Sequence, residues 1–258
     1  MKFTKAFVAL LCLCLAGFGT SWAAPASPQE KTTIKVLASA APREIFIELF
    51  AQFEKQSGYK IEMETSGSVV INKRVDAGDP FDMVVLASGA IDKQIAAGKV
   101  KTGSKVDIAK SGIGIAVRKG AKTPDVSTED ALKQALLASK TIGYSTGPSG
   151  IHILDLLKRW GITDQVKDRL VQVPPGVLVA SIVADGKAEI GFQQLSELVH
   201  SQGIALLGPL PASAQLITVW SAGISATTKQ EEAVKQLLQF LTSPTTAEAK
   251  TKNGMEPI

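Results

Sequence analysis

The sequence predicts an α/β protein of two lobes, each a mostly parallel sheet flanked by helices, joined by a hinge of two crossings. Short apolar runs alternate with segments of helical periodicity along most of the chain, and glycines separate them. This order is typical of doubly wound sheets. Aromatic residues form only 5% of the chain, and this composition also suits an α/β protein.

Residues 1–23 have the pattern of a signal peptide. Two lysines precede an apolar run of 13 residues, Ala6–Phe18, and small residues at positions 21 and 23 predict cleavage after Ala23. The apolar run is too short for a membrane span, which needs ~20 residues. Residues 24–31 contain proline and serine and are expected to form a flexible leader. We therefore expect an exported, periplasmic protein.

Cysteine and charge content exclude several function classes. Cys12 and Cys14 both lie in the predicted signal peptide, so the mature chain has no thiol for a disulfide or a nucleophile. Removing Lys2 and Lys5 lowers the net charge from +4 to +2, and no basic patch predicts a nucleic-acid partner. The sequence has neither metal-ligand spacing nor a phosphate-binding or dinucleotide-binding fingerprint, so we expect no cofactor.

Residues 32–110 are expected to form most of lobe 1. The apolar runs Ile34–Ala38 and Met83–Leu86 predict buried strands, and alternation from Tyr59 to Met63 predicts a half-buried strand between them. Apolar residues at helical spacing from Ile45 to Phe53 predict a helix. A short amphipathic helix is expected before the third strand, and a polar connection follows the lobe's last short helix. Strands and helices in this order predict a parallel unit.

Residues 111–221 are expected to form lobe 2. Three short segments, Ile113–Val117, Thr141–Ser145 and Glu189–Phe192, predict strands, with helical periodicity between them. Residues 222–258 are expected to complete lobe 1 with an amphipathic helix and a frayed tail.

The chain is predicted to cross between the lobes twice, near Ala109–Gly112 and Trp220–Ile224. Such a hinge places a ligand cleft between the lobes, at the carboxyl ends of strands.

Four loops of small or hydroxyl residues fall at predicted strand ends: 39–41, 65–68, 87–88 and 145–150. Each lies next to a helix start, where free backbone N–H groups and the helix dipole favour an anion. One such loop taken alone is better explained as an ordinary helix cap. Four in corresponding positions predict an anion-binding site.

Two longer polar side chains extend this candidate site. Arg43 lies in the first turn of a helix and is either a solvated surface residue or a bidentate clamp for a carboxylate. Gln193 and Gln194 follow a predicted strand, and one of these amides is a candidate donor to a ligand, although glutamine at a helix start also caps.

Catalysis has no support in the sequence. The segment 147–150 is not the G-x-S-x-G motif of a nucleophilic serine. His152 and His200 are interpreted as structural or peripheral, and no paired carboxylates are recognisable. We therefore expect that the protein is not an enzyme. An enzyme or a ligand-sensing module on the same fold is the alternative.

Along nearly its whole mature length the chain resembles the periplasmic molybdate-binding proteins of ABC importers, which have the type II periplasmic-binding fold. The matching segments are IKVLASAAPREIF, ETSGSVVINKRVDAGDPFDMVVLAS, GYSTGPSG, VASIVADGKAEIGF and FLTSPTTAEAKTKNGMEPI. The resemblance implies two lobes that close over a small dehydrated anion and deliver it to a membrane permease. We expect a monomer.

The resemblance also implies specific site residues. Ser66–Ser68 match the family's hydroxyl loop, Ala87 matches a backbone N–H donor, and Gly150 and Gly176 fall near other backbone donors. The full set of candidate ligand-binding residues is Ser39, Ala41, Arg43, Ser66, Gly67, Ser68, Ala87, Ser88, Thr146, Ser149, Gly150, Gly176 and Gln194.

Two positions depart from the family pattern. Ala41 stands where the family carries a ligand serine, with Ser39 two residues earlier, and Gln194 stands in place of a tyrosine hydroxyl. Arg43 lies beside the first departure. An organic di- or tricarboxylate, which offers carboxylates to an arginine and a carbon body to apolar walls, is therefore at least as consistent with the site as molybdate.

Overall fold

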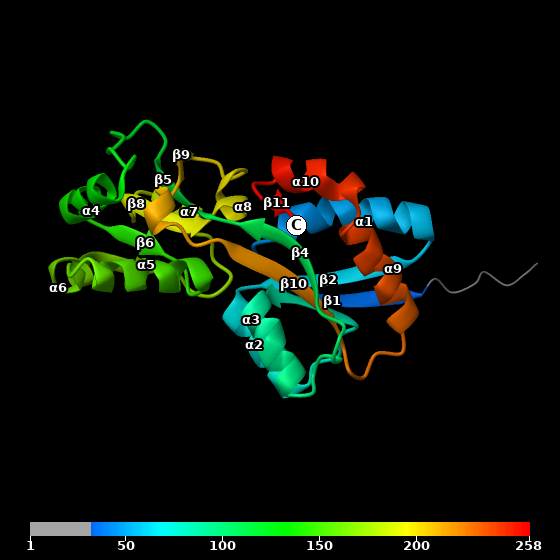
Figure 1. The fold of residues 1–258 in the computed structure, drawn as a ribbon. Helices are drawn as coiled ribbons and strands as arrows, with labels where there is room; N and C mark the ends of the chain where they lie inside the picture. The colour runs from blue at the N-terminus through cyan, green and yellow to red at the C-terminus, as the bar shows by residue number, and fades with distance from the viewer. Residues whose placement is uncertain (1–31) are drawn as a thin grey trace, which may run out of the picture. The chain divides into compact units, whose positions relative to one another are not determined.

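The computed structural model describes residues 32–258 and shows two β-sheets, each with its own helices (Figure 1). The predicted signal peptide (1–23) and leader (24–31) lie outside the described residues. We call the six-stranded sheet with its helices lobe 1 and the five-stranded sheet with its helices lobe 2. The predicted lobe boundaries, at 110/111 and 221/222, remain predictions.

Lobe 1 contains a sheet with the strand order β11-β4-β10-β3-β1-β2. β1 pairs in parallel with β2 and β3, whereas β10 is antiparallel to β3 and β4, and β11 is antiparallel to β4. The strands are β1 (Thr33–Ser39), β2 (Lys60–Ser66), β3 (Met83–Ala87), β4 (Val106–Ser111), β10 (Thr218–Ile224) and β11 (Glu256–Pro257). The helices are α1 (Arg43–Ser57), α2 (Ser68–Ala77), α3 (Ser88–Ala96), α9 (Glu231–Leu241) and α10 (Ala247–Lys252), with the 3₁₀ turn η3 (Pro244–Thr246).

Different helices cover the two faces of the lobe 1 sheet. Val36 of β1 belongs to the core cluster on the α1 and α9 side, where the rings of Phe46 and Phe50 stack with centroids 4.8 Å apart. Leu37, the next residue, belongs to the cluster on the opposite side, with Ile71 of α2. Side chains alternate along a strand, so β1 is apolar at consecutive positions because both faces of the sheet are buried.

Lobe 2 contains a sheet with the strand order β7-β6-β8-β5-β9. β6 pairs in parallel with β7 and β8, whereas β5 is antiparallel to β8 and β9. The strands are β5 (Ile113–Arg118), β6 (Ile142–Tyr144), β7 (Leu170–Gln172), β8 (Ile190–Gln194) and β9 (Ile204–Pro209). The helices are α4 (Glu129–Ala138), α5 (Pro148–Arg159), α6 (Thr163–Val166), α7 (Val179–Ala184) and α8 (Leu195–Leu198), with the 3₁₀ turns η1 (Lys167–Arg169) and η2 (Ala212–Ala214). Within residues 32–258, no helix has the length and apolar composition needed to cross a membrane.

The predicted α/β class with two lobes is confirmed, but both sheets are mixed rather than mostly parallel. A parallel pair needs a crossover connection, usually a helix. The chain leaves lobe 1 through β4 and returns through β10, and these two strands run side by side in opposite directions. In lobe 2, β5 is antiparallel to both of its neighbours, β8 and β9. The predicted frayed tail is also wrong, because Glu256 and Pro257 pair with Lys110 and Ala109 of β4.

Gln194 joins the two crossings between the lobes. In the amide orientation that satisfies both of its ends, the side-chain oxygen accepts from Thr218 Oγ1 (3.0 Å) and the nitrogen donates to the carbonyl of Ser111 (3.1 Å). Thr218 and Ser111 are the residues of β10 and β4 nearest to lobe 2. The buried amide therefore connects the end of β8 to both strands of lobe 1 that enter the hinge.

The start of α5 packs tightly on the loop that precedes it. A Cβ atom on Gly150 would lie 1.7 Å from the carbonyl oxygen of Ser145, whereas a Cβ atom on Gly147 would meet nothing closer than 3.7 Å. Gly150 is therefore required by packing, whatever its relation to a ligand.

We expect Gly150→Ala to lower the free energy of unfolding by about 3 kcal/mol, because the backbone itself must move to admit the methyl group. This loss corresponds to a fall of roughly 6–12 °C in Tm, measurable by calorimetry. Gly147→Ala, in the same loop, is the matched control and should change Tm by much less. Equal Tm values for the two variants would contradict the packing argument.

Candidate functional site

Two adjoining cavities lie between residues of the two lobes. The small cavity, about 40 Å³, is bordered by the start of α2, the loop 145–149 and the end of β8. Because one water needs roughly 10–15 Å³ by this measure, it has room for a group the size of one carboxylate. The large cavity, about 450 Å³, is bordered by Arg43, Thr65 and Ser66 of lobe 1 and by the α7 and α8 regions of lobe 2. Ala40, Gly176 and Glu197 border both cavities.

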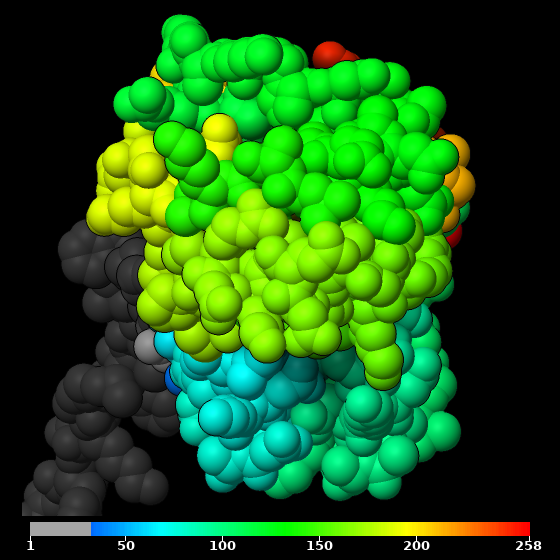
Figure 2. All heavy atoms as spheres, turned by 90° about the vertical axis from the view of Figure 1, so that its left-hand side faces the viewer, coloured from blue at the N-terminus to red at the C-terminus, as the bar shows by residue number. Residues whose placement is uncertain are grey.

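The lobes touch beside these cavities, at Gly67 and Gly176. A Cβ atom on Gly67 would lie 2.9 Å from the backbone nitrogen of Gly176 and 3.2 Å from Cα of Pro175. Gly67 has φ −58°, which any residue adopts, so the contact with the other lobe requires glycine here. Figure 2 shows one face of the molecule, on which the yellow-green surface of lobe 2 lies against the cyan surface of lobe 1.

A pair of serines stands at the helix start on each side of the small cavity. In lobe 1 Ser39 Oγ and Ser68 Oγ are 3.0 Å apart, and in lobe 2 Ser145 Oγ and Ser149 Oγ are 2.9 Å apart. Neither α2 nor α5 has a side chain bonded to its N-terminal N–H groups as a cap. The geometry thus brings two helix N-termini and several hydroxyls to one small space, an arrangement that suits an anion.

The structure brings most of the candidate residues together. Those that border the small cavity are Ala41, Gly67, Ser68, Thr146, Ser149, Gly176 and Gln194, while Arg43 and Ser66 border the large one. Ser39 does not border either cavity but pairs with Ser68. Ala87, Ser88 and Gly150 also border neither cavity.

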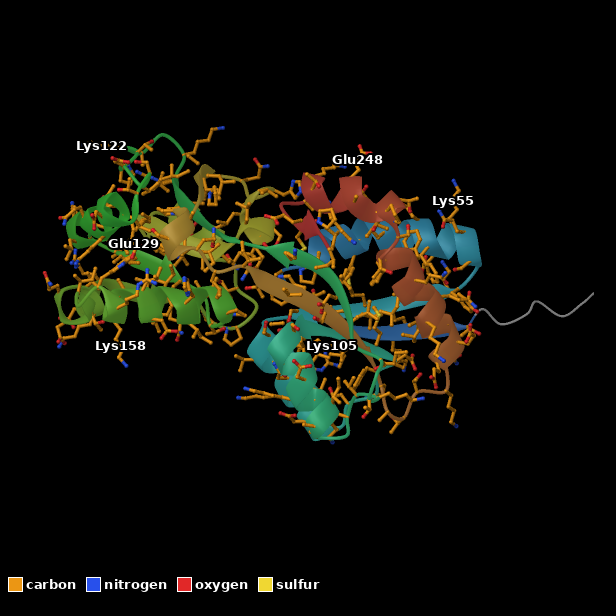
Figure 3. All side chains as sticks on the ribbon, viewed as in Figure 1. Lys55, Lys105, Lys122, Glu129, Lys158 and Glu248 are labelled. Carbon is orange, nitrogen blue, oxygen red and sulfur yellow. The ribbon has the colours of Figure 1, made fainter. Side chains whose placement is uncertain are left out.

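The charges around the site are few. Arg43 is half-exposed and pairs with Glu44, which also borders the large cavity. Among residues 32–258, no group of three or more His, Cys, Asp or Glu side chains is placed to hold a metal ion. Figure 3 shows charged side chains projecting from the outside of the ribbon, and none of those it labels borders either cavity: Lys55, Lys105, Lys122, Glu129, Lys158 and Glu248.

Glu197, on α8, is the functional candidate that the sequence reasoning missed. It lies three residues after the end of β8, and the backbone N–H of Gln194 donates to its carboxylate. Gln193 Nε2 donates to Glu197 Oε1 (2.8 Å), and Gln193 is itself fixed because its Oε1 accepts from the N–H of Val179 (2.7 Å). A glutamate at this helix position is also a common cap, so the sequence pattern alone does not single it out.

Burial raises the pKa of the Glu197 carboxyl from its ordinary value of 4.5 to about 7, and the two hydrogen bonds to its ionised form oppose this rise without overcoming it. A cap on the surface would keep an ordinary or lowered pKa. A carboxyl with a pKa near neutrality, at the junction of two cavities, is suited to take up and return a proton.

The fold and cavities define the class of the protein. Two α/β lobes joined by two crossings, with a cavity between them, are the architecture of type II solute-binding proteins. The chain belongs to the bacterial extracellular solute-binding protein family, whose pattern matches residues 34–256.

Individual relatives extend this assignment. An aconitate isomerase from Pseudomonas sp is 34% identical over 238 residues, covering 89% of this chain and 90% of that protein. The periplasmic molybdate-binding protein of Azotobacter vinelandii superimposes with a TM-score of 0.73 at 20% identity, covering 86% of this chain and 98% of that one. The sulfate-binding protein SubI of Mycobacterium tuberculosis gives 0.72 at 15%, covering 88% and 87%. The two structural likenesses show the fold alone.

The relationship to aconitate isomerase corrects one expectation. The sequence reasoning excluded an enzyme because it found no activated nucleophile and no paired carboxylates, but a relative similar over nine-tenths of its length is an enzyme. A single carboxyl whose pKa is raised by burial is a feature that such a search does not detect.

We expect Glu197→Gln to stabilise the protein increasingly as pH rises. A carboxyl whose pKa is raised on folding stabilises the folded state fully below pH 4.5, and this contribution is lost as pH rises toward 7. The free-energy difference between variant and wild type should therefore grow between pH 4.5 and 7, by up to about 3 kcal/mol, and then stay constant. Urea denaturation at several pH values measures it.

The neighbouring Ser196→Ala is the control for that experiment, because it removes no titratable group and its effect on stability should not vary with pH. Parallel stability curves for wild type and Glu197→Gln would show that the carboxyl has an ordinary pKa.

We expect Gly67→Ala to separate the lobes while leaving each intact. The methyl group meets only the opposite lobe, so stability should change by no more than about 0.5 kcal/mol, while the radius of gyration from small-angle scattering rises. Gly89→Ala, in the first turn of α3 with nothing within 4 Å of its Cβ, is the control. An unchanged radius would mean that the contact at Gly176 does not hold the lobes together.

Proposed function

We propose that this protein is an isomerase that moves a proton within an unsaturated tricarboxylate of the aconitate type, using the cleft of a solute-binding fold. The observation that carries the proposal is Glu197, a carboxyl with a pKa of about 7 that borders both the small anion cavity and the large cavity. The similarity to an aconitate isomerase supports the choice of substrate.

The chemistry of aconitate needs little from a protein beyond one such group. Aconitate carries a carboxylate on each of the three carbons of a propene unit, and its methylene protons lie next to both a carboxylate and the double bond. Removing one of them breaks a C–H bond and leaves a delocalised allylic anion. Returning the proton to the other end of the allyl unit forms a new C–H bond and shifts the double bond. No oxidant or reductant is consumed, and one carboxyl can serve as both base and acid.

The two cavities can hold different parts of such a substrate. One carboxylate fits the small cavity, where the α2 and α5 N-termini and the paired serines supply neutral donors, each worth about 1.5–3 kcal/mol to a charged acceptor. The rest of the molecule extends past Glu197 into the large cavity, where Arg43 can exchange Glu44 for a second carboxylate. Glu197 then lies beside the carbon chain rather than beside a carboxylate.

The surrounding residues support proton transfer in two ways. Gln193 fixes the orientation of the Glu197 carboxyl through the bond to its Oε1, which is a positioning role. The burial of Glu197 keeps the pKa of its carboxyl near neutrality, where it can both take up and return a proton.

Capture of a small anion for a membrane permease is the second candidate, and the family match favours it. In that role Ser66, Ser68 and Ser149, which border the cavities, would hold a carboxylate or an oxyanion without changing it. Four expectations are the same under either proposed function and remain proposals: export, a monomeric state, the absence of a nucleic-acid partner, and the lobe boundaries.

The test is isomerisation of cis- and trans-aconitate by the purified protein, followed through their vinyl protons by NMR. We expect wild type to approach the same cis-to-trans ratio from either isomer, with kcat/KM rising to a plateau around an inflection near pH 7. Glu197→Gln should lower kcat by roughly 10²–10⁴-fold, the usual contribution of an acid–base group.

The matched control is Glu62→Gln, the same chemical change at an exposed carboxylate of β2 that borders neither cavity, which should keep wild-type rates. The saturated analogue tricarballylate separates binding from catalysis. If wild type binds tricarballylate but leaves both aconitate isomers unchanged, the protein is a solute-binding protein and the isomerase proposal fails.

A further inference from the structure

A ligand with three carboxylates meets few cations in the walls of the two cavities. Among the described residues that border either cavity, Arg43 is the one permanent cation, and His200 is the only other side chain that can become positively charged. The small cavity offers neutral donors to one carboxylate, and Arg43 can pair with a second. Because an enclosed charge without a partner is costly, the third carboxylate requires a further group.

His200 stands at the edge of the large cavity, where the two lobes meet. It follows Glu197 by three residues, and positions three apart share a face of a helical turn, so both side chains border this cavity. The exposed ring of His200 reaches lobe 1, because its Nε2 lies 2.7 Å from Asn253 Oδ1. Asn253 Nδ2 in turn lies 3.5 Å from Glu48 Oε2 on α1. Glu48 is one helical turn after Glu44, which also borders the large cavity.

Asn253 determines which ring nitrogen of His200 is left for a ligand. Asn253 Nδ2 donates to the carbonyl of Ala249 (2.8 Å), so its Oδ1 is an acceptor and His200 Nε2 must be the donor. Nδ1 has no hydrogen-bond partner among the described residues. An unprotonated Nδ1 is only an acceptor, which a carboxylate cannot bond, whereas a protonated Nδ1 makes the ring a cation that donates to a carboxylate.

The charged groups around His200 come from α1, α8 and α10: Arg43, Glu44, Glu48, Glu197 and Lys252. Arg43 pairs with Glu44, and Lys252 Nζ lies 3.6 Å from Glu48 Oε2. Since these two pairs balance, a carboxylate that enters the cavity adds net negative charge. A negative charge beside an imidazole favours its protonated form, and histidine takes up a proton near neutral pH.

We propose that His200 is a ligand-binding residue of the large cavity, which takes up a proton when a tricarboxylate binds and pairs through Nδ1 with the carboxylate that neither Arg43 nor the small cavity holds. The class of ligand rests on the proposed function. The residue rests on its place in the cavity wall and on the bond to Asn253, which leaves Nδ1 for the ligand.

The direct test follows the ring nitrogens of ¹⁵N-histidine-labelled protein by NMR during titration with tricarballylate at about pH 8, above the usual titration range of histidine. The chain contains two histidines, and the other one, His152, is a built-in control. Its Nε2 lies 2.7 Å from the carbonyl of Ala214, and it borders neither cavity. We expect His200 Nδ1 to move into the range of a protonated nitrogen while the His152 signals stay in place. Molybdate, small enough for the small cavity alone, should leave both residues unchanged.

Calorimetry gives a second readout that a purely structural role would not change. His200→Gln keeps a side-chain donor for Asn253 but cannot be protonated, so it should bind tricarballylate about 10- to 100-fold more weakly. His152→Gln should keep wild-type affinity. In buffers of different ionisation enthalpy, wild type should take up about one proton more per bound ligand than His200→Gln. Equal proton uptake by the two proteins would contradict the proposal, even if the affinities differ.

The wild-type spectra decide the matter even if His200→Gln fails to fold. A His200 ring that stays unprotonated in the saturated complex would overturn the proposal, as would an absence of tricarballylate binding. An equal shift with molybdate would also overturn it, because lobe closure rather than contact would then be the cause. Tricarballylate has no double bond to shift, so these outcomes are independent of catalysis. Protonation of His200 in a protein that cannot isomerise aconitate would retain the binding residue and reject the isomerase.

Discussion

The contact between Gly67 and Gly176 is the constraint on which the site depends, because it brings the two lobes together without a side chain between them. With the lobes in contact, Glu197 borders both cavities, and its burial there raises the pKa of its carboxyl. The paired serines reach one space for the same reason. The groups of the site lie together only because the two sheets meet here, since residues of both lobes border each cavity.

Local sequence patterns predicted most strands and helices of each lobe, but they did not predict β4 and β11, the two strands at one side of the lobe 1 sheet. The apolar stripe from Ile45 to Phe53 is buried in α1 as predicted, and the parallel pairing of β1 with its neighbours follows from strand and helix order. β4 was missed because Val106–Ser111 mixes polar and apolar residues, and β11 because two residues carry no periodicity. β4 is a strand because it pairs with β10, and β11 is a strand because it pairs with β4.

The anion-binding part of the candidate site was visible in the sequence, and the proton-transfer part was not. Hydroxyls at a helix start are recognisable one loop at a time, so Ser68 and Ser149 could be selected. The raised pKa of Glu197 comes from its burial, which is known only once the surroundings of the side chain are built. Gln194, read as a ligand donor, has its amide engaged with Ser111 and Thr218 at the hinge.

The position of Glu197 also bears on the fate of the proton it carries in the proposed isomerase. Its side chain is only partly buried and borders the large cavity, so solvent that enters this cavity reaches the protonated carboxyl. Isotope placed on the methylene carbon would then be lost in part to water before the remainder reappears on the other end of the allyl unit.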